Sequence, residues 1–473
     1  MATDLSAGSG HRFHPSILRE YDIRGIIGET LGPADARAVG RAFATVLHAR
    51  GATRVAVGRD GRLSSPALEA ELVAGLVECG IDVLRTGLGP TPLLYFAEAS
   101  TPEVQGGIQV TGSHNPGHHN GFKLVLEGRP FFGEDLLELG RIAAEGRWTP
   151  APRAGRVEDV DLLAAYVDRL LHGLDGLDRA ALARLRIGWD AGNGAAGPAI
   201  AALTARLPGE HHLLFTDVDG HFPNHHPDPT EERNLADLRA LVAAKQLDFG
   251  VAFDGDGDRI GAVDATGRVV WGDQLLMIYA EDLLRRRPGA AVIADVKASQ
   301  ALFDRVAALG GEPVMWKTGH SLIKSRMKAI AAPLGGEMTG HVFFADDWYG
   351  FDDALYAAVR LIAACLRLGR TLTALRGAMP DLHNTPELRI PVAEGRKFAI
   401  VAEVAARLAA AGADVNSIDG VRVRTADGWW LLRASNTQAA LTARAESPDA
   451  AGLAWLLADL DAQLAVSGVS RGA

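Results

Sequence analysis

The stretch Arg54-Val55-Ala56-Val57 is a short, strand-like apolar run, and residues 66–79 after it form a helical segment rich in Ala and Leu. The same order recurs at residues 187–189 followed by 195–207, and a run at 291–294 opens a third unit. This alternation predicts several α/β units with substantially parallel sheets. Because each of these strands ends in a polar turn, the layout favours one domain type repeated along the chain over a short-period solenoid.

Length and composition are those expected of a soluble cytoplasmic protein. The 473 residues suggest about three domains, with interior enough for several cores. The net charge of -10 disfavours nucleic acid, although a local basic pocket for an anionic small molecule is compatible with it. Residues 1–9 lack the basic start and apolar core of a signal peptide, and no apolar run of about 18 residues predicts a membrane span. Cys79 and Cys365 are expected to be buried, reduced thiols.

A constrained turn, Thr111-Gly112-Ser113-His114-Asn115-Pro116, follows the apolar run at residues 108–110. Since Asn115-Pro116 disfavours helix, Ser113 is predicted to be exposed where a strand ends. Its hydroxyl is therefore a candidate nucleophile. Taken alone, a turn of this composition is more often only a turn.

The run Asp254-Gly255-Asp256-Gly257-Asp258-Arg259 places three carboxylates at alternate positions after the apolar segment 249–253. Such carboxylates repel one another unless a cation lies between them, and hard oxygen ligands suit Mg²⁺ or Ca²⁺. An EF-hand is excluded, because Arg259 and Ala265 stand where that loop needs Gly and Glu. The run predicts a Mg²⁺ site with positions left for a phosphoryl oxygen.

A third polar run, at residues 432–438, brings together Arg433, Ser435, Asn436 and Thr437 after a strand-like segment. A guanidinium fork beside short donors is typical of a phosphate-binding loop. The same residues could instead cap a helix, and both roles are compatible because a helix N-terminus favours anions.

A fourth polar run, at residues 335–341, carries Glu337 and Thr339 between glycines. A carboxylate and a hydroxyl in such a loop can accept from and donate to the vicinal hydroxyls of a sugar. Without its context, the run reads equally well as a loop that caps a helix.

Together these runs make the chain resemble the α-D-phosphohexomutase family, most closely its bacterial phosphomannomutase/phosphoglucomutase branch. The resemblance covers roughly residues 13–460, and the serine turn with the tri-aspartate run is its most specific pair. The further motifs that carry it are Glu20-Tyr21-Asp22-Ile23-Arg24-Gly25, Gly58-Arg59-Asp60-Gly61-Arg62, Asn120-Gly121-Phe122-Lys123, Phe222-Pro223-Asn224-His225-His226-Pro227 and Asp295-Val296-Lys297.

The resemblance implies three similar mixed α/β domains and a smaller C-terminal α+β domain around a central cleft. We expect the serine loop in residues 1–158, the metal loop in 159–267, the sugar loop in 268–380 and the phosphate loop in 381–473. It also implies a monomer that acts on small-molecule hexose phosphates.

The resemblance further implies that phosphorylated Ser113 exchanges its phosphoryl group with a hexose phosphate through a 1,6-bisphosphate. Mg²⁺ would be held by Asp254, Asp256 and Asp258 with phosphorylated Ser113, and glucose or mannose 1,6-bisphosphate would serve as activator. Arg24 would add positive charge, and Lys123 and His341 would act as general acid and base. The substrate would be bound by Tyr21, Arg259, Lys297, His320, Glu337, Thr339, Arg433, Ser435, Asn436 and Thr437.

The sequence departs from the family pattern in two places. Thr339 stands where Ser is expected, and its extra methyl stiffens the side chain, which puts the sugar fit in question. Gln438 and Ala439 replace the usual Thr-Pro, which puts the rigidity of the phosphate loop in question.

Three alternatives remain open from the residues alone. Residues 192–197 match G-x-G-x-x-G with Asp217 beyond them, as in a dinucleotide-binding oxidoreductase, but this leaves the other runs unexplained. A sugar-phosphate-binding module without turnover would not require the Ser113 nucleophile. His221, His225 and His226 could suggest zinc, but no cysteine lies near them and a shaped loop is favoured.

Overall fold

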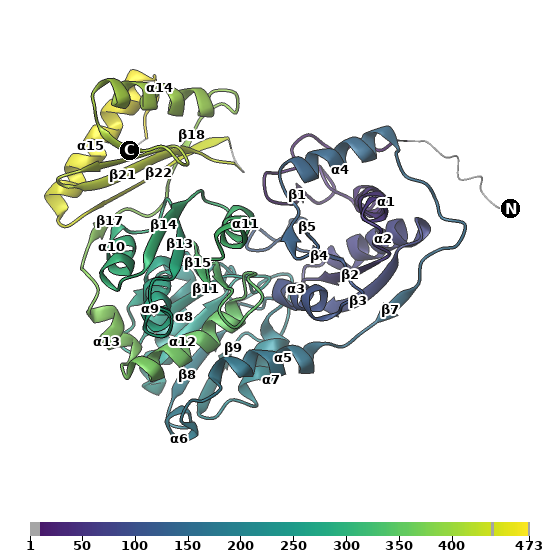
Figure 1. Cartoon of the computed structure of the whole chain (residues 1–473), viewed down its shortest axis with the longest axis horizontal. Helices are drawn as coiled ribbons and strands as arrows, with labels where there is room; N and C mark the ends of the chain where they lie inside the picture. The colour runs from purple at the N-terminus through teal and green to yellow at the C-terminus, as the bar shows by residue number, and fades with distance from the viewer. Residues whose placement is uncertain (1–9, 437–438, 472–473) are drawn as a thin grey trace.

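The computed structural model describes residues 10–436 and 439–471 and contains four β-sheets, which follow one another along the chain (Figure 1). The first three sheets each combine parallel strands with an antiparallel strand, whereas the fourth is antiparallel throughout. Three mixed α/β domains and a C-terminal α+β domain are therefore confirmed. The residue boundaries assigned to them above stay a prediction.

The first sheet has the strand order β1-β5-β4-β2-β3-β7, and β6 pairs with β5. Alternate residues of β2 face two different cores: Val55 and Val57 lie on one side of the sheet and Ala56 on the other. Both faces are buried, as is usual for parallel strands. The elements are β1 (Ile23–Ile26), α1 (Pro33–Ala49), β2 (Arg54–Arg59), α2 (Ser65–Glu78), β3 (Asp82–Leu88), α3 (Thr91–Ser100), β4 (Gly106–Val110), β5 (His119–Leu126), β6 (Arg129–Pro130), α4 (Glu134–Glu145) and β7 (Val157–Asp159).

The second sheet has the order β12-β11-β10-β8-β9, and the third has the order β14-β13-β15-β16. The second domain contains α5 (Leu163–Leu171), α6 (Arg179–Leu182), β8 (Arg186–Asp190), α7 (Gly197–Thr204), β9 (Glu210–Leu214), α8 (Ala236–Lys245), β10 (Phe249–Phe253), β11 (Ile260–Asp264) and β12 (Val269–Val270). The third contains α9 (Gly272–Arg286), β13 (Ala291–Asp295), α10 (Gln300–Ala308), β14 (Glu312–Trp316), α11 (His320–Ile330), β15 (Leu334–Gly336), β16 (Val342–Phe344), α12 (Ala354–Leu368) and α13 (Leu372–Gly377).

The fourth sheet has the order β17-β22-β21-β20-β19, with β18 also paired to β22. Its apolar core includes residues of α14 and α15, such as Ile400 and Leu460. The elements are β17 (His383–Asn384), β18 (Leu388–Pro391), α14 (Lys397–Ala410), β19 (Asp414–Asn416), β20 (Val421–Thr425), β21 (Gly428–Ala434), β22 (Ala440–Ser447) and α15 (Ala450–Val466).

The cores show how the domains are joined. One continuous apolar cluster includes Ala56 of the first sheet, Trp189 of the second and Phe344 of the third. The fourth domain instead has a core of its own around Trp430, and Figure 1 shows its sheet beyond β13 and β14 of the third domain. The first three domains thus share an interior, whereas the fourth packs on the third through a small buried cluster of Val296, Trp429 and Leu431.

Each of the four polar runs lies at the same kind of place, the turn between a strand and its antiparallel neighbour. The turns join β4 to β5, β10 to β11, β15 to β16 and β21 to β22. This repeated placement explains how runs far apart in the sequence can face one ligand.

The remaining expectations concern composition. Cys79 and Cys365 are free and buried, and burial raises the pKa of Cys79 to about 11 and that of Cys365 to about 12. Among the described residues, no helix is both long enough and apolar enough to cross a membrane.

Candidate active site

Ser113 lies in the turn after β4 with a left-handed backbone, φ +50°, which is uncommon for a residue with a side chain. Its N–H donates to Thr111 Oγ1 at 2.8 Å, and the residue is 3% exposed. The prediction of an exposed Ser113 was therefore wrong, because Arg62 and Asp254 pack against the turn. A strained conformation of this kind persists only where the surroundings over-determine it. Ser113 is thus presented by a rigid turn.

The serine turn is clamped from the loop after β2. Arg62 donates to the carbonyl oxygens of Ser113 (2.7 Å), Asn115 (2.5 Å), Pro116 (2.7 Å) and His119 (2.9 Å). Asp60 accepts from Thr111 Oγ1 at 2.8 Å and from the N–H of residue 112 at 3.0 Å. The sequence motif at residues 58–62 did not predict this clamp, because backbone carbonyl acceptors leave no pattern in side chains.

Arg24 approaches the same turn from β1. Its guanidinium donates to the Gly112 carbonyl at 2.5 Å and to Asn115 Oδ1 at 3.0 Å, and it forms an ion pair with Asp22. It also lines the central cavity described below. Arg24 therefore adds positive charge beside Ser113 while it holds the turn.

The tri-aspartate turn meets the serine turn across the boundary of the first two domains. Ser113 Oγ donates to Asp254 Oδ2 at 3.0 Å. Asp254, Asp256 and Asp258 are fully buried, and one oxygen of each lies within 4.8 Å of the others. Burial, followed by the neighbouring Asp256 and Asp258, raises the pKa of Asp254 well above its usual range, so the cluster is short of positive charge.

These residues fit a Mg²⁺ ion. Oδ1 of Asp256 and Oδ1 of Asp258 are buried and have no hydrogen-bond partner, although buried polar atoms are normally paired. Carboxylate oxygens are the ligands that Mg²⁺ prefers. The two unpaired oxygens and Asp254 thus offer a ready set of hard ligands.

Lys123, on β5, contacts the two aspartates that Ser113 does not bond to. Its ammonium donates to Asp256 Oδ2 at 2.7 Å and also to Asp258 Oδ2. Burial favours the neutral amine, but Asp256 and Asp258 outweigh it and raise the pKa of Lys123. Without a metal or substrate, Lys123 is therefore a charged group and so a proton donor rather than an acceptor.

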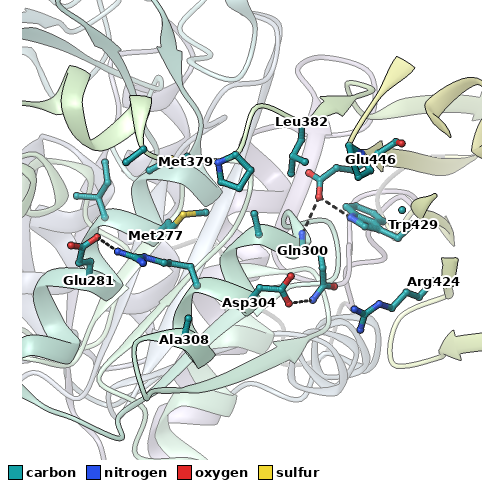
Figure 2. Close-up of a pocket in the computed structure, with 18 of the residues that line it drawn as sticks. Met277, Glu281, Gln300, Asp304, Ala308, Met379, Leu382, Arg424, Trp429 and Glu446 are labelled. Carbon is teal, nitrogen blue, oxygen red and sulfur yellow. Dashed lines mark hydrogen bonds and ion pairs between the residues drawn. The ribbon is translucent and has the colours of Figure 1, made fainter. Parts of the chain in front are cut away.

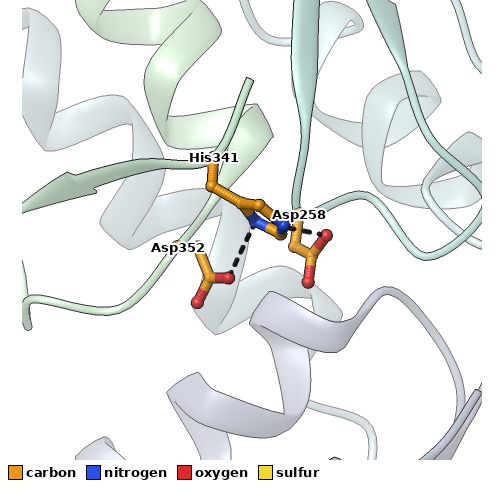
Figure 3. Close-up of side chains that lie close together, drawn as sticks. All are labelled: Asp258, His341 and Asp352. Carbon is orange, nitrogen blue, oxygen red and sulfur yellow. Dashed lines mark ion pairs between the residues drawn. The ribbon is translucent and has the colours of Figure 1, made fainter. Parts of the chain in front are cut away.

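His341 follows the sugar turn and faces the aspartates (Figure 3). Its Nε2 accepts from Arg259 Nε at 3.0 Å, and its Nδ1 lies 3.0 Å from Asp352 Oδ2 and 3.7 Å from Asp258 Oδ1. His320 stacks on the ring with centroids 5.4 Å apart. Burial, followed by the charge of Lys324, lowers the pKa of His320 well below its usual range, so His320 is neutral.

The sugar turn is organised by Glu337. Its Oε1 accepts from the N–H of Gly319 at 2.9 Å, and its Oε2 accepts from Thr339 Oγ1 at 2.9 Å. The hydroxyl of Thr339 thus points to the carboxylate with which it was expected to act. That the methyl group of Thr339 alters the fit of the sugar stays a prediction.

The cationic end of the site lies between the third and fourth domains. Arg433 donates to Asp419 Oδ2 at 3.0 Å, and its Nη2 is buried without a partner. Lys297 donates to Glu387 Oε2 at 3.0 Å. A buried guanidinium N–H that lacks an acceptor is suited to an anionic ligand.

Tyr21 connects three domains at this end. Its hydroxyl donates to the Thr318 carbonyl at 2.7 Å and accepts from Asn436 Nδ2 at 2.5 Å. The N–H of Ser435 donates to the Ala440 carbonyl and so closes the phosphate turn. Thr437 and Gln438 lie outside the described residues.

A cavity of about 440 Å³ joins these groups. Residues from all of the first, second, third and fourth domains line it, which agrees with the expected central cleft. The predicted site residues on its wall are Tyr21, Arg24, Ser113, Lys123, Arg259, Lys297, His320, Glu337, Thr339, His341, Arg433, Ser435 and Asn436. The three aspartates lie behind Ser113 and Lys123 and do not reach the wall.

A second cavity, of about 640 Å³, lies between the third and fourth domains away from these residues (Figure 2). Its wall includes Glu446, whose Oε1 accepts from Trp429 Nε1 at 2.9 Å and from the N–H of Gln300 at 3.0 Å. No predicted site residue belongs to it. Its charged groups of both signs point to no particular ligand.

The glycine-rich run of the dinucleotide alternative packs against the metal turn. The N–H of Ala195 donates to the Gly255 carbonyl at 2.9 Å, and a Cβ on Gly194 would lie 2.9 Å from that oxygen. These glycines therefore allow two turns to touch, and a dinucleotide has no place between them.

The three histidines of the zinc alternative have separate partners. His221 pairs with Asp219, His225 lies 3.0 Å from Asp190 Oδ2, and His226 Nε2 contacts the His114 carbonyl. They do not converge on one point, so the loop is structural. His114 itself pairs with Asp228 at 2.8 Å.

Comparisons with known proteins agree with this geometry. Models of phosphoglucomutase/phosphomannomutase match the chain in order: alpha/beta/alpha domain I at residues 15–148, domain II at 164–267, domain III at 271–382 and the C-terminal domain at 387–463.

Individual relatives match over nearly the whole chain. A phosphomannomutase/phosphoglucomutase of Pseudomonas aeruginosa is 44% identical over 94% of each chain. A phosphoglucomutase of Neisseria gonorrhoeae is 43% identical over 92% of this chain and 94% of its own. The crystal structure of a phosphoglucomutase/phosphomannomutase family protein from Burkholderia thailandensis has a TM-score of 0.89 at 42% identity, over 96% of this chain and 98% of that one.

Proposed function

We propose, since this chain belongs to the phosphoglucomutase/phosphomannomutase family, that it interconverts hexose 1-phosphate and hexose 6-phosphate. The observation that carries the proposal is the contact of 3.0 Å between Ser113 Oγ and Asp254 Oδ2, at one end of a cavity whose other end holds Arg433 and Lys297. A nucleophile and a distant cationic pocket are what the transfer of a phosphoryl group between two ends of one sugar requires.

Phosphorylated Ser113 gives its phosphoryl group to the free hydroxyl of the bound hexose phosphate, which yields a 1,6-bisphosphate. The bisphosphate turns over and returns its other phosphoryl group to Ser113. Throughout, Arg433, Ser435, Asn436, Thr437 and Lys297 hold the phosphate that is not reacting. Arg433 suits this duty because its Nη2 lacks a partner.

The carboxylates of Asp254, Asp256 and Asp258 would hold Mg²⁺ together with an oxygen of phosphorylated Ser113. When bound, the ion offsets negative charge on the transferring group. Arg24 and Arg259 add fixed positive charge on the side of the cavity. Free hexose 1,6-bisphosphate would restore the phosphoserine when it is lost.

Proton transfer falls to Lys123 and His341. Lys123 is charged and suited to donate, and His341 offers an imidazole lone pair at Nε2. In the substrate-free site, Arg259 covers that lone pair, and a sugar hydroxyl would take the place of its N–H. Tyr21 and His320 complete the wall against which the substrate rests.

Glu337 and Thr339 would bind O3 and O4 of the sugar, whose configuration glucose and mannose share. We therefore propose that the enzyme accepts both sugars. We also propose that it acts as a cytoplasmic monomer without nucleic-acid or membrane partners. Comparable rates on glucose 1-phosphate and mannose 1-phosphate would support dual specificity. A preference above about a thousandfold, or ~4 kcal/mol, would contradict it.

The decisive experiment is a coupled assay of glucose 1-phosphate conversion with Mg²⁺ and trace glucose 1,6-bisphosphate. We expect turnover that EDTA abolishes and that Ser113→Ala lowers by at least about 10³-fold, because the covalent intermediate cannot form. If protein shown by mass to carry phosphoserine turns over neither glucose nor mannose 1-phosphate, the chain is a binding protein for sugar phosphates or acts on another sugar.

A further inference from the structure

The imidazole of His341 has groups of opposite character at its two nitrogens, a hydrogen bond at Nε2 and a close ion-pair contact at Nδ1. Arg259 Nε, which can only donate, lies 3.0 Å from Nε2. Asp352 Oδ2, which as a carboxylate can only accept, lies 3.0 Å from Nδ1 (Figure 3). Together they select the tautomer with its hydrogen on Nδ1 and its lone pair on Nε2.

Asp352 is in turn directed by Lys324. It is fully buried, and its Oδ1 accepts from Lys324 Nζ at 2.7 Å. The Lys324 ammonium lies 4.7 Å above the ring of Tyr95, which fixes it from a second side. Neither Asp352 nor Lys324 lines the central cavity, so neither can touch a substrate there.

We propose that Asp352 and Lys324 are positioning residues that fix the tautomer and orientation of His341, so that Nε2 is the atom that exchanges a proton with the sugar hydroxyl. The inference rests on the proposed function, in which His341 performs that exchange. A carboxylate that holds the far nitrogen of a histidine is a common way to orient a reactive ring.

Asp258, His341 and Asp352 also have the composition of a metal site, and one ligand atom of each lies within 4.8 Å of the others. Oδ1 of Asp258, Nδ1 of His341 and Oδ2 of Asp352 face one another without a hydrogen-bond partner, and donors reach the other atoms of the three side chains. Lys123 donates to Asp258, Lys324 donates to Asp352, and Arg259 donates to His341. Three neighbouring cations disfavour a further cation, and the shortest contact within the group, 3.0 Å from His341 Nδ1 to Asp352 Oδ2, is the one that the positioning role uses.

Asp352→Asn is the informative variant, because Lys324 determines which way the new amide points. Lys324 has only donors, so the amide oxygen must face it. The amide NH₂ then faces Nδ1 of His341 and disfavours the hydrogen there. The substitution keeps shape and packing but sets a donor against Nδ1 while Arg259 still donates to Nε2, so the site no longer favours the hydrogen on Nδ1.

The first readout is the tautomer itself, from ¹⁵N chemical shifts of His341 in the substrate-free protein, assigned with His341→Gln. We expect Nδ1–H in the wild type and loss of that form in Asp352→Asn. The second readout is kinetic: kcat should fall about 10- to 100-fold, as for other residues that orient a reactive group, while KM changes less than about threefold.

Asp353→Asn is the matched control. Asp353 is the next residue and is equally buried, but it accepts from the N–H of Tyr356 at 2.9 Å and from the Tyr166 hydroxyl at 2.8 Å. The same substitution there should leave the His341 tautomer and kcat unchanged.

The double variant Asp352→Asn with Lys324→Met sharpens the test. Without Lys324 the amide can turn its oxygen toward Nδ1, so the wild-type tautomer and part of kcat should return relative to Asp352→Asn alone. A merely structural role predicts that the double variant is worse than either single one.

Retention of Nδ1–H and of kcat in Asp352→Asn would overturn the proposal, as would a double variant with no recovery. Circular dichroism and intact mass confirm that each variant folds and carries phosphoserine. The tautomer is read without turnover, so absence of mutase activity in the wild type would contradict the proposed function and leave this inference to be judged separately.

Discussion

The serine turn and the phosphate turn occupy equivalent hairpins but are held in opposite ways. Arg62 and Asp60, both almost fully buried, fix the serine turn from within its own domain. That domain shares one apolar core with the second and third. Ser113, the proposed nucleophile, therefore belongs to a domain that shares the largest apolar core of the described residues.

The phosphate turn instead depends on contacts between domains. Arg433 bonds to Asp419, which also accepts from the N–H of Thr318 at 3.0 Å, and Asn436 reaches Tyr21 of the first domain. The fourth domain has a separate core. The serine turn is therefore fixed within one domain, whereas the phosphate turn is held by hydrogen bonds to other domains, and in the proposed function its end of the site is the one that must open to admit and release the bisphosphate.

Arg62→Met should have the largest effect, because it removes the donor of four carbonyl oxygens and breaks a buried ion pair with Asp60. We expect a loss of about 3–5 kcal/mol in the free energy of unfolding. Misplacement of Ser113 should also lower kcat by about 100-fold. Chemical denaturation and the coupled assay measure the two effects.

Arg85→Met serves as its control, since Arg85 pairs with Asp159 at an exposed position and should contribute less than about 1 kcal/mol. Equal losses from both substitutions would show that the serine turn does not depend on Arg62, and the contrast between the two turns would fail.

Arg433→Lys tests the phosphate turn. It keeps the positive charge but loses the fork that reaches Asp419 and an anion together. We expect KM to rise about 10- to 100-fold, or ~1.4–2.8 kcal/mol, with kcat nearly unchanged. The exposed Arg424→Lys in the same sheet should change neither constant. A fall in kcat with KM unaltered would mean that this turn takes part in the chemistry rather than in holding phosphate.

Tyr21→Phe removes the hydroxyl that joins Thr318 and Asn436. One hydrogen-bonded hydroxyl contributes about 1 kcal/mol, so KM should rise about fivefold. With glucose 1,6-bisphosphate bound, a larger fraction of the Tyr21→Phe variant than of the wild type should remain in the open form. Small-angle scattering with and without the ligand measures this fraction. Unchanged scattering and KM would show that closure does not use this contact.

Thr339→Ser should have the smallest effect. The hydroxyl that donates to Glu337 is kept and only the methyl is lost. We expect the ratio of kcat/KM for mannose 1-phosphate to that for glucose 1-phosphate to change about threefold or less. A tenfold change would show that the methyl group selects the sugar. The turn between β15 and β16, rather than the serine or phosphate turn, would then control sugar specificity.

Much of the fold and of the candidate site could be predicted from the sequence. Strand and helix periods are local, so the alternation at residues 54–79 predicted α/β units correctly, and β2 and α2 lie where expected. The four polar runs contain side chains whose chemistry is visible in the residue names. Helix α7 is shorter than the expected 195–207, because residues before it form the turn that packs on Gly255.

The sequence by itself thus determined the fold class, and it predicted the nucleophile and the three aspartates, since these depend on residue type and short spacing. Only the tertiary structure decided that Arg62 clamps carbonyl oxygens, that Lys123 pairs with Asp256, and that Asp352 and Lys324 stand behind His341. These contacts join residues far apart in the chain through backbone atoms or through common charged residues. Nothing in the local pattern marks such partners, because distance in space, rather than order in sequence, sets the strength of a hydrogen bond or an ion pair.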